Sequence, residues 1–177
     1  MSLKGKMRPM NRAELQAVQA PLKERYREEP ASALVTLRAD GQLDAEQIAC
    51  SVATGRALVE AGLHPATGGT GALACSGDML LEALVACAGV TLRSVATSME
   101  LDVAGNVHAE GDLDFRGTLG VDREAPVGFT AIRLRFDLTS DAPEEKVAKL
   151  LQLTERYCVV AQTLAGGVPL EFSYSTS

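Results

Sequence analysis

The sequence is poor in aromatic residues and has no tryptophan. Aromatic side chains make up 4% of its 177 residues, whereas hydrophobic side chains make up 46%. This length is enough for one domain with a sizeable core, which small and aliphatic side chains must fill. The scarcity of aromatic rings argues against single-stranded nucleic acid as a ligand, because proteins that bind it stack bases on aromatic side chains.

The chain also has no excess of positive charge. Its 17 Lys and Arg residues are outnumbered by 23 Asp and Glu residues, which gives a formal net charge of -6. Nucleic acids and anionic membranes attract basic surfaces, so we expect neither as the main partner. The first residues, MSLKGKMRPMNR, are basic but lack the apolar segment of a secretion signal. We therefore expect a cytoplasmic protein.

Cysteine and histidine are scarce too. The sequence has four cysteines and two histidines, and no two cysteines form a Cys-X-X-Cys pair. This pattern argues against a secreted disulfide scaffold and against a structural zinc site. The glycine-rich stretch 62–71 lacks the Gly-Lys-Ser/Thr ending of a phosphate-binding loop and the spacing of a dinucleotide fingerprint. We expect neither a metal nor a cofactor.

The most apolar stretch runs from Ser76 to Met99, and its middle, Ala83 to Leu92, carries no charge. Apolar residues lie on every face of the expected helix, which is typical of a helix buried all round. The uncharged run is too short to cross a bilayer. Cys87 lies in this middle, where a thiol either fills the core or reacts.

The whole pattern predicts an α+β fold in which helices stack on an antiparallel sheet. Apolar periodicity, strict alternation and turn residues set the expected elements. These are a helix over residues 12–27, a hairpin of strands 33–39 and 42–54 with its turn at Asp40-Gly41, strands 102–104, 107–117 and 128–138 with a turn at Gly105-Asn106, a helix from about residue 140 to 166, and a closing strand over 168–174. We expect an N-terminal arm and helix over residues 1–30 and a single domain over 31–177.

The two long helices carry one cysteine each, Cys87 and Cys158. If the helices pack side by side the two thiols can meet, and a dithiol can trap a sulfenic acid as a disulfide. An apolar neighbourhood raises the pKa of a thiol unless a cation approaches. From spacing alone, two buried structural cysteines explain the pattern better than a reactive pair. We expect Cys50 and Cys75 to be structural.

Several motifs in this order resemble one known family. The run Asp78-Met-Leu-Leu-Glu-Ala-Leu-Val-Ala-Cys87 is followed by Ser140-Asp-Ala-Pro-Glu-Glu, by Glu155-Arg-Tyr-Cys158 and by Gly166-Gly-Val-Pro-Leu. Together they resemble the OsmC/Ohr family, the osmotically inducible and organic hydroperoxide resistance proteins. The resemblance covers roughly residues 33–175. It implies an OsmC-like fold, an intertwined α+β homodimer with two long central helices between the sheets and active sites at the subunit interface.

The resemblance also implies an activity and its residues. Active members of the family are thiol-dependent peroxidases that reduce organic hydroperoxides or hydrogen peroxide. Cys87 matches the cysteine that attacks the peroxide, and Cys158 matches the one that resolves the sulfenic acid. In the family an Arg stabilises the thiolate and an acidic residue holds that Arg. An external dithiol, which is a lipoylated protein for some members, then reduces the disulfide.

This sequence departs from the family pattern at three places. Asp78 matches the acidic position of the OsmC-like branch with one methylene fewer, and it can equally be a helix cap. Arg38 is the nearest match to the family's Arg but is offset by about one residue, and Arg56 is the second choice. Either Arg can instead be an ordinary solvated charge. Val159-Val160 stands where the family usually has residues centred on proline.

These observations leave two main hypotheses for the function. The first is a thiol peroxidase for organic hydroperoxides, in which Cys87, Cys158, Arg38 and Asp78 form the site, with a stress-response role. The alternative is a catalytically weak OsmC-like dimer that binds a small apolar ligand at the subunit interface. A reactive Cys87 separates them, because only the enzyme needs a thiolate near neutral pH. A third hypothesis, a partner-binding module, rests only on the N-terminal helix.

Overall fold

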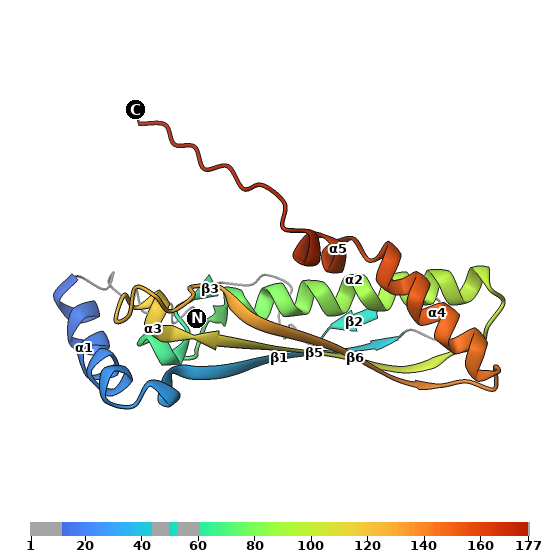
Figure 1. Cartoon of the computed structure of the whole chain (residues 1–177), viewed down its shortest axis with the longest axis horizontal. Helices are drawn as coiled ribbons and strands as arrows, with labels where there is room; N and C mark the ends of the chain where they lie inside the picture. The colour runs from blue at the N-terminus through green and yellow to red at the C-terminus, as the bar shows by residue number, and fades with distance from the viewer. Residues whose placement is uncertain (1–11, 44–49, 53–60, 177) are drawn as a thin grey trace, which may run out of the picture. The chain divides into compact units, whose positions relative to one another are not determined.

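The computed structural model describes residues 12–43, 50–52 and 61–176 (Figure 1). The chain forms two compact units that alternate along the sequence. Unit 1 comprises Met1–Leu37, Leu58–Ser76 and Gly111–Ile132, and unit 2 comprises Arg38–Ala57, Gly77–Glu110 and Arg133–Ser177. The predicted boundary near residue 30, between an N-terminal arm and a single domain, differs from this division into two units. It stays a prediction.

Unit 1 is built around the N-terminal helix. Helix α1 (Arg12–Glu28) is followed by the 3-10 turn η1 (Pro30–Ala33), and later segments add β3 (Ala61–Gly62), η2 (Pro65–Thr67), β4 (Ala74–Cys75) and α3 (Phe115–Thr118). Tyr26 of α1 is fully buried, and its hydroxyl donates a hydrogen bond to the Ala66 carbonyl at 2.6 Å. The ring of His64 stacks on Phe115 with centroids 5.0 Å apart. His64 therefore takes part in the packing of unit 1.

A sheet of four strands, in the order β2-β1-β5-β6, has residues in both units. Its strands are β1 (Leu34–Leu43), β2 (Cys50–Val52), β5 (Ala104–Asp114) and β6 (Phe129–Thr139). Strands β1 and β2 pair antiparallel, with Gly41 opposite Val52 and Leu43 opposite Cys50. The predicted turn at Asp40-Gly41 is wrong, because β1 continues through these residues and the connection falls between 43 and 50. Pairing across the sheet overrides the local turn signal.

The predicted turn at Gly105-Asn106 is also wrong, because β5 runs through it as one strand. Gly105 has a φ of +147°, and a Cβ atom on it would collide with the Asp137 carbonyl of β6. The glycine therefore serves a close approach of two backbones, which only a residue without a Cβ allows. Alternate residues of β5, Val107, Ala109 and Leu113, are buried, as the pattern predicts.

Helix α2 (Ser76–Ser98) is the long apolar helix of the sequence. Its buried residues follow one stripe, at Leu81, Leu84, Val85, Ala88, Gly89, Leu92 and Ala96. The prediction that it is buried all round is wrong for this chain, because Leu80 and Val90 are more than a third exposed. Among the described residues, α2 is the one helix long and apolar enough to span a membrane by length and composition, and core helices share that property.

The second long helix is broken in two. Helix α4 (Glu144–Tyr157) begins after Pro143 with two glutamates, as the start signal predicts, and α5 (Val159–Gly166) ends just before Gly167, whose φ is +59°. Between them Cys158 is extended, with φ -72° and ψ 105°. The prediction of one continuous helix to residue 166 is therefore wrong. The Cys158 N–H still donates to the Thr154 carbonyl, and its carbonyl accepts from the Gln162 N–H, both at 2.9 Å.

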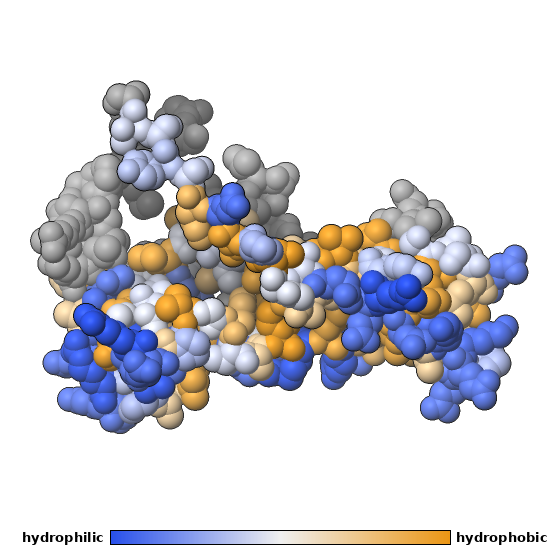
Figure 2. Space-filling model, turned by 45° about the horizontal axis from the view of Figure 1, so that its top comes forward, coloured by the Kyte–Doolittle hydropathy of each residue, from blue (hydrophilic) through white to orange (hydrophobic). Residues whose placement is uncertain are grey.

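The C-terminal segment leads away from α5 without joining a strand (Figure 1). Over residues 168–174, the predicted closing strand pairs with nothing among the residues that the structure describes, so that prediction is wrong for a single chain. Its large side chains are exposed, with Leu170 at 77%, Phe172 at 95% and Tyr174 at 92%. Figure 2 shows further hydrophobic residues at the surface over α2 and α5, where Val90 and Val159 are exposed.

Candidate active site

The structure brings Cys87 and Cys158 together in unit 2. Cys87 lies midway along α2 and is half-buried, whereas Cys158, at the junction of α4 and α5, is 1% exposed. Both are free thiols, and each of them shifts the pKa of the other. The two residues are far apart in sequence and meet only because the α4–α5 break lies against the middle of α2. Their roles in chemistry stay predictions.

Hydrogen bonds favour the ionised form of Cys87. Burial raises the pKa of its thiol, but donors from the Val160 N–H, the Cys158 side chain, the Thr91 hydroxyl and the Val159 N–H outweigh burial, so that the pKa is lowered overall. Donors around a sulfur stabilise the thiolate just as an opposite charge does. The sequence-based expectation considered only a nearby cation, whereas among the described residues hydrogen-bond donors lower this pKa, two of them backbone N–H groups of α5.

Cys158 responds in the opposite sense. Burial raises the pKa of its thiol, and the hydrogen bond to Cys87 and the charge of Cys87 raise it further, against a smaller lowering by the N–H groups of Ala161 and Val160. The two shifts together favour proton loss at Cys87 over proton loss at Cys158. A half-buried thiolate beside a buried thiol can attack an electrophile and then form a disulfide with its neighbour.

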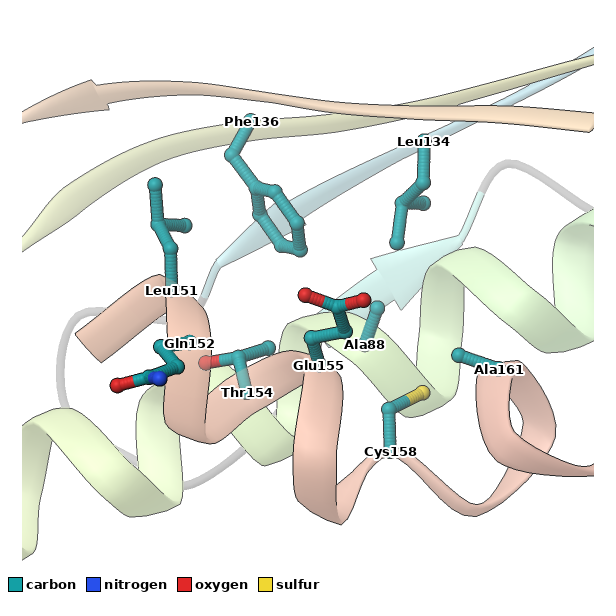
Figure 3. Close-up of a pocket in the computed structure, with 9 residues that line it drawn as sticks. All are labelled: Ala88, Leu134, Phe136, Leu151, Gln152, Thr154, Glu155, Cys158 and Ala161. Atoms are coloured by element: carbon teal, nitrogen blue, oxygen red, sulfur yellow. The ribbon is translucent and has the colours of Figure 1, made fainter. Parts of the chain in front are cut away.

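A cavity of about 530 Å³ adjoins Cys158. Its walls come from α2, β6, α4 and α5, and they are Ala88, Leu134, Phe136, Leu151, Gln152, Thr154, Glu155, Cys158 and Ala161 (Figure 3). Figure 3 shows the Glu155 carboxylate pointing toward Leu134 and Phe136. The Thr154 hydroxyl is already bonded to the Leu150 carbonyl at 2.9 Å. The cavity suits a mainly apolar molecule and exposes it to one carboxylate.

Sequence reasoning did not find the cavity wall. Leu134 and Phe136 are two apart on β6, so the alternation of this strand puts them on one face. The alternation was enough to predict that Leu134 and Phe136 share a face of the sheet. It could not predict which helix packs against that face. Glu155 lies on α4, three residues before Cys158, and this separation is about one helical turn. This spacing is the signal that could have found it.

Asp78 lies apart from the two thiols on α2. It is in the first turn of the helix, nine residues before Cys87, which corresponds to about 13 Å along the helix axis. Burial, and then the charge of Asp78, raise the pKa of Glu82. Direct contact between Asp78 and Cys87 is excluded by the helix rise, so Asp78 can act on Cys87 only through another residue.

The structure says less about the other residues that the sequence singled out. Arg38 lies on β1, but its side chain is outside what the structure describes, and Arg56 lies outside the described residues. Cys50 begins β2, and Cys75 ends β4 as a half-buried free thiol. Across residues 12–43, 50–52 and 61–176, no three His, Cys, Asp or Glu side chains gather closely enough to hold a metal ion.

The OsmC-like protein family matches residues 69–173, more than half of the chain, and this range includes both thiols and the cavity wall. The chain belongs to the OsmC-like family. A search of curated proteins found no matching sequence. Among solved structures, an OsmC-like hydroperoxide resistance protein from Jannaschia sp. CCS1 is similar, with a TM-score of 0.55 and 16% identity over 81% of this chain and 95% of that one.

The comparisons confirm the family that the motifs predicted and the α+β class. The structural neighbour shares the mixture of helices and antiparallel sheet that this OsmC-like chain adopts. At 16% identity the likeness establishes the fold. What the chain does must therefore be argued from its own site.

Proposed function

We propose that this protein is a thiol peroxidase that reduces organic hydroperoxides, with Cys87 as the attacking cysteine and Cys158 as the resolving one. The observation that supports it is the asymmetric thiol pair, in which hydrogen bonds lower the pKa of Cys87 and burial raises that of Cys158. Membership of the OsmC-like family and the hydroperoxide resistance of the structural neighbour point the same way.

The proposed reaction proceeds in three steps. The Cys87 thiolate attacks the outer oxygen of the hydroperoxide, the O–O bond breaks, and the alkoxide leaves as an alcohol after taking up a proton. Cys87 is then a sulfenic acid. The Cys158 thiol attacks its sulfur, the S–S bond forms, and the hydroxyl leaves as water with the Cys158 proton. An external dithiol restores both thiols by exchange, and is itself oxidised to a disulfide.

The cavity supports an organic substrate. Its wall of Ala88, Leu134, Phe136, Leu151 and Ala161 offers apolar contact to the carbon chain of a hydroperoxide. Hydrogen peroxide gains nothing from such a wall. In this proposal Asp78 positions an Arg, with Arg38 before Arg56, as the family resemblance implies. A cytoplasmic location is part of the proposal, since a reducing compartment returns the disulfide to thiols.

We also propose that the protein works as a homodimer. The exposed side chains of Val168, Leu170, Phe172 and Tyr174 alternate with smaller or polar residues, which is the pattern of a strand with one buried face. A monomer leaves this apolar face in water, whereas a second copy can cover it. Sedimentation of the full chain should give the mass of two chains. The Phe172→Asp variant should shift the measured mass toward that of a single chain.

The same cavity favours a second candidate function, the binding of a small apolar ligand without catalysis. Stoichiometric oxidation separates the two. Reduced protein receives one equivalent of cumene hydroperoxide, its free thiols are counted, and mass spectrometry maps any disulfide. The peroxidase loses two thiols to a Cys87–Cys158 bridge, and Cys87→Ser abolishes the bridge while Cys75→Ser keeps it. Four thiols surviving excess peroxide would contradict the peroxidase and favour the binder.

A further inference from the structure

The cavity beside Cys158 combines an apolar wall with one carboxylate. Among the described residues that line it, all from unit 2, Glu155 is the charged one. Figure 3 shows its carboxylate pointing toward Leu134 and Phe136 of β6. Beside apolar side chains the effective dielectric constant is lower than in bulk water, so a cation that enters this space gains more from the carboxylate.

The arginines of β6 lie on the other face of the sheet. Arg133 and Arg135 alternate with the two residues of β6 that line the cavity, so their side chains point away from it. On that face Arg133 contacts Glu110 at 3.5 Å, and Arg135 contacts Asp137 at 2.9 Å. The strand that forms one wall of the cavity therefore offers the Glu155 carboxylate no cation.

The cations of α4 nearest to Glu155 contact other side chains. Lys149 lies six residues before Glu155, about 9 Å along the helix axis, and its ammonium donates to the Gln152 side chain at 2.9 Å. The Arg156 guanidinium lies over the ring of Tyr157, 5.5 Å from the ring centre. Within the part of the chain that the structure describes, the Glu155 carboxylate has no ion pair. A ligand that enters the cavity can supply the missing positive charge.

We propose that this cavity binds an organic cation, a small molecule with an apolar body that ends in an ammonium group. The volume of about 530 Å³ is typical of a small-molecule site, and the apolar wall contacts the body. The Glu155 carboxylate pairs with the ammonium, and the nearby ring of Phe136 favours a cation over a neutral group. The inference concerns the cavity that the proposed function uses, yet it requires no reaction at Cys87.

The first test uses three ligands that share one body and differ in charge, namely 3-phenylpropylamine, 3-phenylpropanol and 3-phenylpropanoate. Each is titrated into the reduced full chain at low ionic strength, and binding is followed by the nuclear magnetic resonance signals of the ligand. Glu155→Gln should weaken the amine about three- to tenfold, change the alcohol less than about twofold and strengthen the carboxylate. Glu145→Gln, which removes the same charge from the first turn of α4, is the matched control and should follow the wild type. Added salt should weaken the amine in the wild type.

Ala161→Leu tests where the ligands bind. Ala161 lines the cavity from α5, and leucine is a good helix former, so the variant should fold, which circular dichroism checks. The larger side chain takes up part of the cavity and should weaken all three ligands by a similar factor. Unchanged binding of the amine to this variant would mean that the amine binds outside the cavity, and would overturn the inference.

The outcomes separate this inference from the proposed function, because binding is measured without peroxide. An amine affinity that Glu155→Gln leaves unchanged, or that Glu145→Gln lowers as much, would overturn the inference alone in protein that cumene hydroperoxide still oxidises. A wild type that binds none of the three ligands would also overturn it. Thiols that resist the peroxide, in a protein that still selects the amine through Glu155, would overturn the proposed function alone.

Discussion

The ionised forms of Asp114 and Cys87 are favoured in different ways. Asp114 in unit 1 is 4% exposed, and Arg116 contacts its carboxylate at 2.6 Å. The Arg116 side chain, with its N–H and its charge, lowers the pKa of Asp114 against burial, which raises it. Cys87 in unit 2 relies on hydrogen-bond donors, two of them backbone groups from a helix more than seventy residues further along the chain.

The difference lies in how far each arrangement depends on the fold. Asp114 and Arg116 are two residues apart, and Asp114 also caps the short helix α3 through the Arg116 N–H at 3.0 Å. A local turn is enough to form this pair. The contributions of Cys158, Val159 and Val160 to the pKa of Cys87 exist only when α4, α5 and α2 are packed. A site made by tertiary packing can therefore lose its chemistry through a small shift that leaves a local ion pair intact.

Removing the resolving thiol should have the largest effect. Cys158→Ser keeps a donor beside Cys87 but cannot form the disulfide, so turnover with a dithiol should fall by at least about a hundredfold. One equivalent of peroxide should still convert Cys87 to a sulfenic acid, which dimedone traps and mass spectrometry detects. Undiminished turnover would show that another thiol resolves the intermediate, and Cys75→Ser in the same background would identify it.

Breaking the local ion pair should affect stability and spare the thiols. Asp114→Ala removes a helix cap and leaves Arg116 with Asp122 at 3.4 Å, so we expect a loss of about 2 kcal/mol in unfolding free energy. Urea unfolding at pH 7 measures it, and the pH profile of Cys87 alkylation by iodoacetamide should not move. A shifted profile would contradict the independence of the two regions.

The pH dependence of Asp114 follows from its lowered pKa. Its contribution to stability is present above the unfolded pKa of about 4 and is lost as the pH falls through the lower folded pKa. The difference between wild type and Asp114→Ala should therefore be full at neutral pH and should shrink in acid below about pH 4. A constant difference down to the acid limit would show that capping, and not charge, carries the effect.

We expect the smallest effect from changing the charge of the cavity beside Cys158. Glu155→Gln removes the carboxylate that points into the cavity, while Gln152→Glu adds a second one. Because the cavity opens to solvent, screening limits the effect, and we expect a rise of about two- to fivefold in kcat/KM for an anionic fatty-acid hydroperoxide. Cumene hydroperoxide should change less than twofold. Gln152→Glu should act in the opposite direction, and equal changes for both substrates would argue against a charge effect.

Much of the molecule could be predicted because its signals are local. The start of α4 at Glu144 after Pro143, the end of α5 before Gly167, and the alternation of β5 and β6 all follow from neighbouring residues. The spacing of the two cysteines on two helices raised their meeting as one of two explanations. The family resemblance then favoured it, and that family is confirmed.

The misplaced elements share a physical cause. Asp40-Gly41 and Gly105-Asn106 both have the composition of turns, yet strand pairing carries β1 and β5 straight through them. The sequence around Cys158 has no proline or glycine to mark a break, since Tyr157 and Val159 flank it. In these places contacts between distant segments outweigh local propensity, and such contacts cannot be read from a window of neighbours.

The sequence alone determined the family, the α+β class and the two cysteines, because these depend on motifs and periodicities that survive without coordinates. Only the tertiary structure decided that α4 ends at Tyr157, that groups of α5 lower the pKa of Cys87, and that Glu155 lines the cavity. The reason is that a thiol's ionisation depends on which donors reach its sulfur. The donors on α5 come from a segment that only packing brings to α2.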